Sequence, residues 1–163
     1  MRRTILALTF AVPAVLASAI VGTAQAPASG GHLLATPSQI TWEPGPPALP
    51  AGMQAVILEG DLSKPGAFTV RAKMPDGYVV PPHFHPGDEH VTVLQGTLFM
   101  GMGEKLDKTG GHELPAGSFA MMPKGTKHFV WTKGETIIQI HGIGPWDITY
   151  VNPKDDPRKK TSN

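Results

Sequence analysis

The sequence predicts an all-β protein in which many short strands form a sandwich or barrel. Nineteen glycines and 17 prolines, together about a fifth of the 163 residues, separate short apolar runs without a regular period. The run 67–74 alternates apolar and polar side chains, as a half-buried strand does, and no segment shows the apolar spacing of a helix. At this length and with 40% hydrophobic residues, we expect one globular domain with its own core.

Residues 1–26 are predicted to be a signal peptide. Arg2 and Arg3 precede an uncharged apolar run that ends near Ile20, and small residues follow it. Two small-residue triplets fit a cleavage site, so the cut is expected between positions 19 and 28. One alternative is an uncleaved membrane anchor, but the apolar run is short for a membrane span. Another is a twin-arginine export signal, but no polar residue precedes Arg2 and Arg3. We therefore expect a periplasmic or secreted protein without stable membrane association after processing.

Charge and cysteine content exclude several functions. Removal of the leader takes away Arg2 and Arg3, which shifts the formal net charge from +1 to −1, and no basic cluster remains. Nucleic-acid binding is disfavoured, because it needs a basic face. With no cysteine, the chain has no disulfide, no thiolate nucleophile and no cysteine metal ligand.

The rest of the chain divides into an extension, a barrel and a tail. Residues 27–52 are rich in proline and glycine and are expected to form an extension, in which Trp42 packs rather than binds a ligand. Apolar runs between turns fill 53–151 and predict about ten strands of a barrel. Residues 152–163 carry mixed charges and two prolines and predict a polar, solvated tail.

A candidate site lies between residues 77 and 96. His83 and His85 are two residues apart, so their imidazoles leave the same face of an extended strand. A Pro-Gly-Asp turn then reverses the chain, and Glu89 opens the apolar return strand. Two imidazoles and a carboxylate that converge suit a divalent first-row metal with open positions. His128 is a fourth candidate, and the alternative is a histidine pair that is exposed or hydrogen-bonded without a metal.

Two motifs in this part of the chain closely resemble those of the cupin family. The first, G-x5-H-x-H-x3-E-x6-G, fits every position from Gly77 to Gly96. The second, G-x5-P-x-G-x2-H-x3-N, fits from Gly117 to His128 and has Thr132 in place of its final asparagine. The resemblance covers about 54–151, which is most of the mature chain.

The resemblance implies a single-domain, type 2-like cupin, whose fold is a jelly-roll barrel (a double-stranded β-helix). It also implies a metal site with His83, His85, Glu89 and His128 as ligands. Since Thr132 replaces a structural residue and not a ligand, the implied site is complete. Dimerisation through edge strands, giving a homodimer, is expected from the resemblance alone.

Other side chains are candidates for the pocket of such a barrel. Ile138 and Ile140 share one face of their strand, which leaves His141 on the other. The alternation does not say which face points inward, so His141 is either a catalytic acid or base in the pocket or a core histidine. His90 is expected to face away from Glu89. Four methionines are predicted to fill gaps in the core: Met100, Met102, Met121 and Met122.

The function expected from these observations is a metal-dependent enzyme of the periplasm or exterior. A dioxygenase-like oxidoreductase with a small organic substrate ranks first, and a lyase or isomerase second, because the fold and the ligands do not fix the reaction. The alternative is a non-catalytic cupin that binds a small ligand or metal. Histidine and glutamate ligands suit one divalent transition metal, which could be iron, manganese, nickel, copper or zinc.

Overall fold

The structure, a computed structural model, describes residues 32–159, so the predicted signal peptide and the last four residues of the tail lie outside it. Its regular structure consists of nine strands and four single turns of 3-10 helix, without an α-helix in the described range. The strands are β1 (Glu43–Pro44), β2 (Gln54–Glu59), β3 (Gly66–Met74), β4 (Val79–Phe84), β5 (Glu89–Met102), β6 (His112–Pro115), β7 (Phe119–Met122), β8 (His128–Gly144) and β9 (Thr149–Tyr150). The 3-10 turns are η1 (Pro37–Gln39), η2 (Lys108–Gly110), η3 (Pro153–Asp155) and η4 (Pro157–Lys159). No helix within 32–159 is long and apolar enough to cross a membrane. The prediction of an all-β jelly-roll barrel is confirmed.

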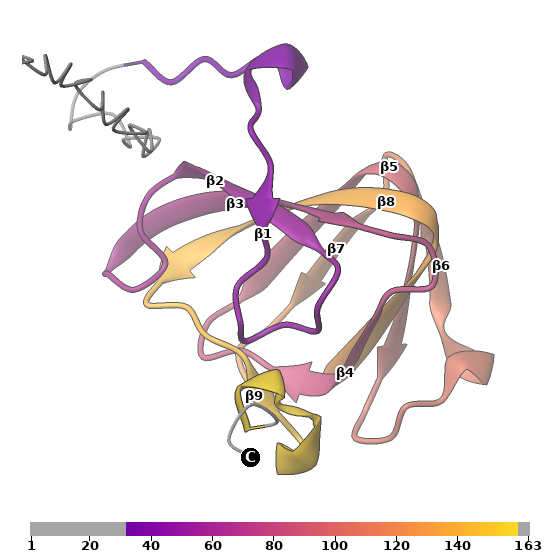
Figure 1. Cartoon of the computed structure of the whole chain (residues 1–163). Helices are drawn as coiled ribbons and strands as arrows, with labels where there is room; N and C mark the ends of the chain where they lie inside the picture. The colour runs from indigo at the N-terminus through magenta and orange to yellow at the C-terminus, as the bar shows by residue number, and fades with distance from the viewer. Residues whose placement is uncertain (1–31, 160–163) are drawn as a thin grey trace, which may run out of the picture.

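Two long antiparallel strands, β5 and β8, form the spine of the barrel (Figure 1). Each strand contains a glycine at positive φ, Gly96 in β5 and Gly134 in β8, and continues through it. The register between the strands shifts around Gly96. A side chain at Gly96 would place its Cβ 2.3 Å from the Glu135 carbonyl oxygen, so only glycine lets the two strands bend together here.

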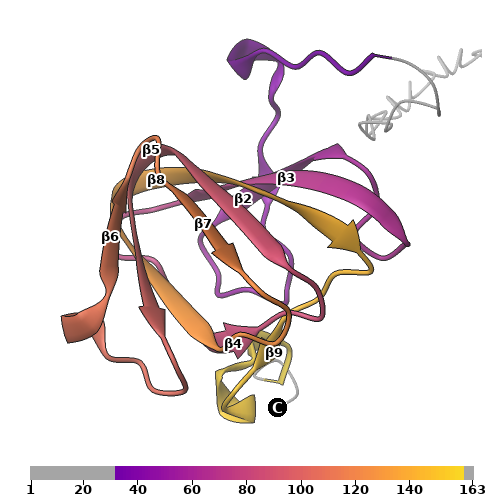
Figure 2. The same cartoon turned by 180° about the vertical axis from the view of Figure 1, so that it is seen from behind.

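The other strands extend this spine on both sides. The hydrogen-bonded order is β1-β2-β3-β8-β4-β9, and β5 additionally pairs with β6, β7 and β8. In Figures 1 and 2 the sheet curls round so that β4 lies across the barrel from β2 and β3. The two halves of β8 therefore serve different walls, because 136–144 pair with β3 while 128–131 pair with β4.

Side-chain alternation fills the barrel interior. On β3, Phe68, Ala72 and Met74 are buried, as the sequence pattern predicted. Matching inward positions on β5 and β8 complete a continuous apolar core. At one end of this core the buried side chains are histidines and a glutamate instead of apolar groups.

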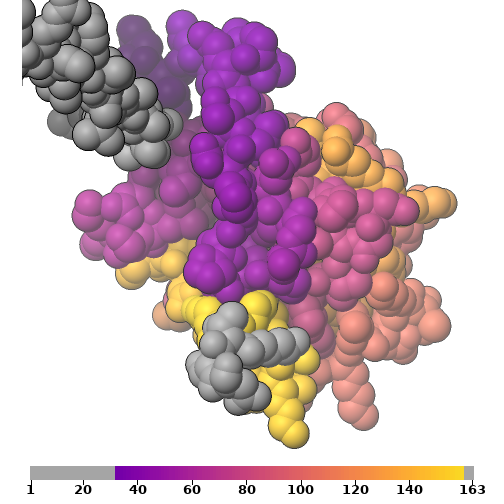
Figure 3. Space-filling view, viewed as in Figure 1, coloured from indigo at the N-terminus to yellow at the C-terminus, as the bar shows by residue number. Residues whose placement is uncertain are grey.

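The N-terminal extension closes the front of the barrel. β1 pairs with β2 at the sheet edge, and residues 45–52, here called the strap, then run across the barrel (Figures 1 and 3). Two buried tyrosines hold the strap, since Tyr78 donates a hydrogen bond to the Pro50 carbonyl and Tyr150 donates one to Ala48. Burial raises the pKa of both phenols, which therefore keep the protons that they donate.

The C-terminal segment is more ordered than a solvated tail. Residues 153–159 form the turns η3 and η4, and Asp156 is buried. Arg158 donates to both Asp156 carboxylate oxygens at 2.9 Å and to the Ile148 carbonyl at 3.1 Å. The mixed charges of this segment thus pair with each other, while most of its described residues remain exposed to water.

Candidate metal centre

Three histidines converge at one end of the barrel interior. His83 lies near the end of β4, His85 follows that strand, and His128 opens β8 directly opposite His83. One ring nitrogen from each lies within 4.8 Å of the others, and all three residues are buried. We call His83, His85 and His128 the histidine cluster.

Each imidazole of the cluster is oriented by a backbone carbonyl. The Nδ1 atom of His83 lies 2.7 Å from the Pro81 oxygen, and that of His128 lies 3.0 Å from the Thr126 oxygen. The Nδ1 atom of His85 lies 2.8 Å from the Asp147 oxygen. Because a carbonyl only accepts, Nδ1 must carry the hydrogen in all three rings, which leaves each neutral Nε2 with a lone pair. This is how proteins usually orient histidines that bind a metal.

Glu89, the first residue of β5, brings a carboxylate to the cluster. Its oxygens lie 3.1 Å from the His128 Nε2 and 3.7 Å from the His85 Nε2. With Nδ1 protonated, a neutral His128 faces the carboxylate with a lone pair, so two acceptors meet at hydrogen-bond distance. The His85 Nε2 and a Glu89 oxygen are buried without a hydrogen-bond partner. Only a cation, either a proton or a metal ion, satisfies this arrangement.

The electrostatics of the histidines follow from burial and from Glu89. Burial lowers the pKa of His83 well below its usual value of 6.5, and the charges of His128 and His85 lower it further. Burial also lowers the pKa of His85, although Glu89 opposes this. Burial likewise acts to lower the pKa of His128, but the hydrogen bond and the charge of Glu89 outweigh it and the pKa is raised. Two of the three imidazoles are therefore kept neutral, the form that binds metals.

Hydrogen bonds between two turns fix the relative positions of the motifs. The Gly125 N–H donates to the His85 carbonyl at 3.0 Å, and the Lys124 N–H donates to the Asp88 carboxylate at 2.8 Å. The turn after His85 and the turn before His128 are thus joined directly. Asp88 and Gly125 therefore help to hold together the turns that flank the candidate ligands.

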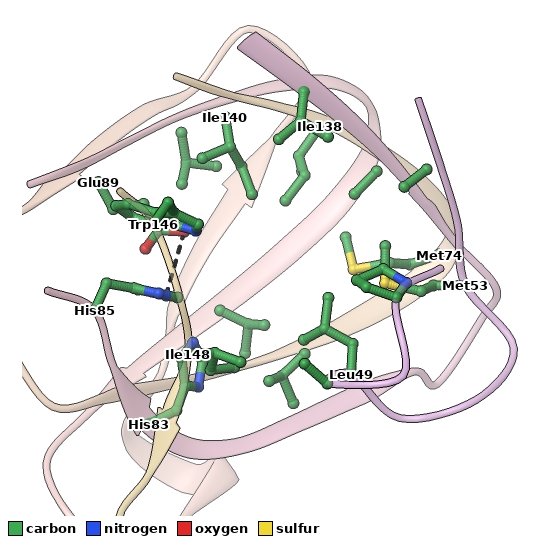
Figure 4. A pocket seen from close by; sticks show the side chains of 18 of the residues that line it. Leu49, Met53, Met74, His83, His85, Glu89, Ile138, Ile140, Trp146 and Ile148 are labelled. Carbon is green, nitrogen blue, oxygen red and sulfur yellow. Dashed lines mark ion pairs between the residues drawn. The ribbon is translucent and has the colours of Figure 1, made fainter. Parts of the chain in front are cut away.

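An apolar cavity of about 360 Å³ opens from the histidine cluster into the barrel. Figure 4 shows His83, His85 and Glu89 at one end and Leu49, Met53 and Met74 at the other. Three strap residues contribute to the wall, and neither lysine nor arginine lines the cavity among the described residues. The site combines one polar end with an otherwise hydrophobic chamber.

Two contributors to this site were not found by sequence analysis. Trp146 stacks on His85, with ring centroids 4.3 Å apart and planes 14° from parallel, and it lines the cavity. The neighbouring Asp147 supplies the carbonyl that orients His85. The only signal was the Gly-Pro-Trp sequence at 144–146, which ends β8 without saying where the chain turns.

The structure does not bring His141 to the cluster. Ile138 and Ile140 line the cavity, so His141 lies on the opposite, exposed face of β8. There it stacks against His90, its partner on β5, with ring centroids 5.0 Å apart. The expectation of an acid or base inside the pocket is therefore wrong for His141, because the inward face of β8 is the isoleucine face. His90 faces away from Glu89, as expected.

Comparisons with known proteins agree with this fold. The structure resembles a putative acetylacetone dioxygenase from Methylibium petroleiphilum, with a TM-score of 0.62 and 18% identity over 82% of this chain and 90% of that one. It also resembles the polyketide cyclase RemF from Streptomyces resistomycificus, with a TM-score of 0.53 and 19% identity over 68% and 79% of the two chains.

Sequence relationships lead to the family. A germin-like protein (subfamily 3 member 2) of Arabidopsis thaliana is 29% identical over 82 residues, which are half of this chain and 36% of that protein. This chain thus matches about a third of that relative's length. The family model of the ChrR cupin-like domain matches residues 31–147. The chain belongs to the cupin superfamily, in the family of ChrR cupin-like domains.

Proposed function

We propose that the protein binds one divalent transition metal through His83, His85, His128 and Glu89. The observation that carries this proposal is the convergence of three buried imidazoles, with one ring nitrogen of each within 4.8 Å of the others. The buried Glu89 carboxylate lies 3.1 Å from the His128 Nε2 and 3.7 Å from the His85 Nε2. Nitrogen and oxygen donors without thiolate fit iron, manganese, nickel, copper or zinc.

We further propose that the protein is a dioxygenase-like oxidoreductase that acts on a small organic molecule. A metal at this site would supply Lewis acidity or activate dioxygen. The chain's own contribution is the chamber, which excludes water and has room for a small ligand of low polarity. Such a ligand would direct its oxygen atoms to the histidine end, because the walls elsewhere offer almost only apolar contacts. A putative acetylacetone dioxygenase has a similar fold, which is compatible with this function.

The cavity is mostly lined by side chains that cannot exchange protons. Beyond the cluster and Glu89, its polar lining consists of Ser63, Tyr78 and Asp147. The Tyr78 hydroxyl is engaged with the strap, and the Asp147 carboxylate accepts from the Ile148 N–H. A proton that moves during the reaction would therefore be held most directly by Glu89, which faces the cavity. Export to the periplasm or exterior, which is proposed from residues 1–26, would place this chemistry outside the cytoplasm.

Metal content tests the first proposal. Elemental analysis of the purified protein should find about one transition metal per chain, and His83→Ala should lose it while remaining folded. His141→Ala is the matched control, because it removes an imidazole from the outer face of the same barrel. A folded wild type that stays empty after reconstitution would refute the metal site.

Turnover separates the enzyme from a binding protein. The metal-loaded wild type should consume dioxygen with an apolar, oxygen-bearing substrate, and His83→Ala should not. A metal-loaded protein that binds such molecules without converting them would instead be a binding cupin. One that isomerises or cleaves them without consuming dioxygen would belong to the second-ranked enzyme class.

A further inference from the structure

A second cavity, which shares only Met100 with the main chamber, is lined by four of the chain's methionines. It measures about 260 Å³ and lies among β5, β6, β7 and the turn before β8. Its lining residues include four methionines and one histidine: Met100, Met102, Met121, Met122 and His112. We call it the methionine cavity.

The strand register explains why Met100, Met102, His112 and Met122 line the same cavity. Met100 and Met102 are two residues apart on β5, so their side chains leave the same face. His112 on β6 is the direct antiparallel partner of Met100 and shares this face. Met122 on β7 is the partner of the inward-facing Glu89, which places its side chain inward as well.

Gap filling accounts for only half of these methionines. Met100 and Met122 are 5% and 4% exposed, as core residues are, but Met102 and Met121 are 52% and 49% exposed. An apolar side chain that is half in water gains little from burial. The His112 imidazole is also exposed, and it has no hydrogen-bond or ion-pair partner among residues 32–159.

The donor chemistry selects one class of ligand. Thioethers are soft donors that suit Cu(I), while hard divalent ions need oxygen donors. No aspartate, glutamate, lysine or arginine is part of this wall within the described range, so its donors are thioethers and one imidazole. We propose that the methionine cavity binds Cu(I) through Met100, Met102 and His112, with Met122 as a fourth donor. This site shares no ligand with the histidine cluster.

Cu(I) itself is the probe that tests the proposal. The full chain, with [methyl-13C]methionine and under nitrogen with ascorbate, is titrated with Cu(I) against a chromogenic Cu(I) chelator. The methyl signals of Met100, Met102 and Met122 should shift and saturate with one Cu(I). The signals of Met53 and Met74, which line the main cavity, should stay in place and serve as internal controls.

Variants decide whether the proposed donors are the real ones. Met102→Leu and His112→Gln should each weaken Cu(I) binding at least about tenfold, since even outer-shell partners of a metal are worth about 10- to 100-fold. Both side chains are exposed, so neither change should unfold the protein. Met53→Leu should change the affinity less than about twofold.

Two results would overturn the assignment. One is a saturated titration in which the methyl signals of Met102 and Met122 do not move. The other is an equal loss of affinity in Met53→Leu and Met102→Leu. His83→Ala should still bind this Cu(I), so a failure of the proposed enzyme site would leave the methionine site intact, and the reverse also holds.

Discussion

Thr132, which stands where the cupin motif has asparagine, offers a quantitative test of the fold. Its side chain is 3% exposed, donates to the Pro75 carbonyl at 2.6 Å and accepts from the Tyr78 N–H at 2.9 Å. It thereby ties the turn before β4, the strand that carries His83, to the middle of β8. We predict that Thr132→Val, which keeps the shape and removes the hydroxyl, lowers the free energy of unfolding.

The expected loss of stability depends on the two backbone groups that the Thr132 hydroxyl leaves behind. A buried polar group that loses its partner costs about 1–3 kcal/mol. Here the Tyr78 N–H still lies 3.3 Å from the Pro75 oxygen, so the two groups left behind retain a weaker bond with each other. The loss should therefore be about 1–2 kcal/mol, which corresponds to roughly 2–4 °C in Tm for each kcal/mol.

Urea denaturation of the variant and the wild type measures this loss. Thr69→Val is the matched control, because the Thr69 hydroxyl donates only to the exposed Glu59, and its change should stay within about 0.5 kcal/mol. A Thr132→Val protein as stable as the wild type would show that the hydroxyl does not hold the turn, and the explanation of the motif's last position would fail.

Three other predictions concern the bend, the strap and the metal. Gly96→Ala should destabilise the protein by about 1–3 kcal/mol in the same assay, because the new Cβ would meet the Glu135 carbonyl; wild-type stability would refute the close approach. Tyr150→Phe removes the bond to Ala48, so it should cost about 0.5–1.5 kcal/mol and speed limited proteolysis within the strap; an unchanged cleavage rate would refute the tether. If the metal site is correct, chelation should lower Tm by about 5–10 °C in wild type and not in His83→Ala.

The sequence located the candidate ligands because their spacing is local. A two-residue separation on a strand and a tight turn suffice to aim His83, His85 and Glu89 at one point. The alternation of residues 138–141 gave a correct strand with two opposite faces, and a period of two does not say which face is inward. His141 was therefore misplaced although its strand was correct.

The parts of the site that the sequence did not predict depend on long-range packing. Trp146 reaches His85 from a segment about 60 residues later, and nothing in either local sequence encodes that contact. The strap was predicted only as part of a proline- and glycine-rich extension. Its place depends on two phenols that become donors to it only once the barrel has formed.

The strap and the candidate metal ligands come from separate parts of the sequence. All four candidate ligands lie within 83–128, while the strap contributes Pro46, Ala48 and Leu49 to the chamber wall. A protein that began at Met53, the predicted start of the barrel, would keep every candidate ligand and lose the front wall of its chamber. Exchanging the strap between related proteins should thus alter which molecules fit the chamber without changing any candidate ligand, so the extension is a natural target for redesigning specificity.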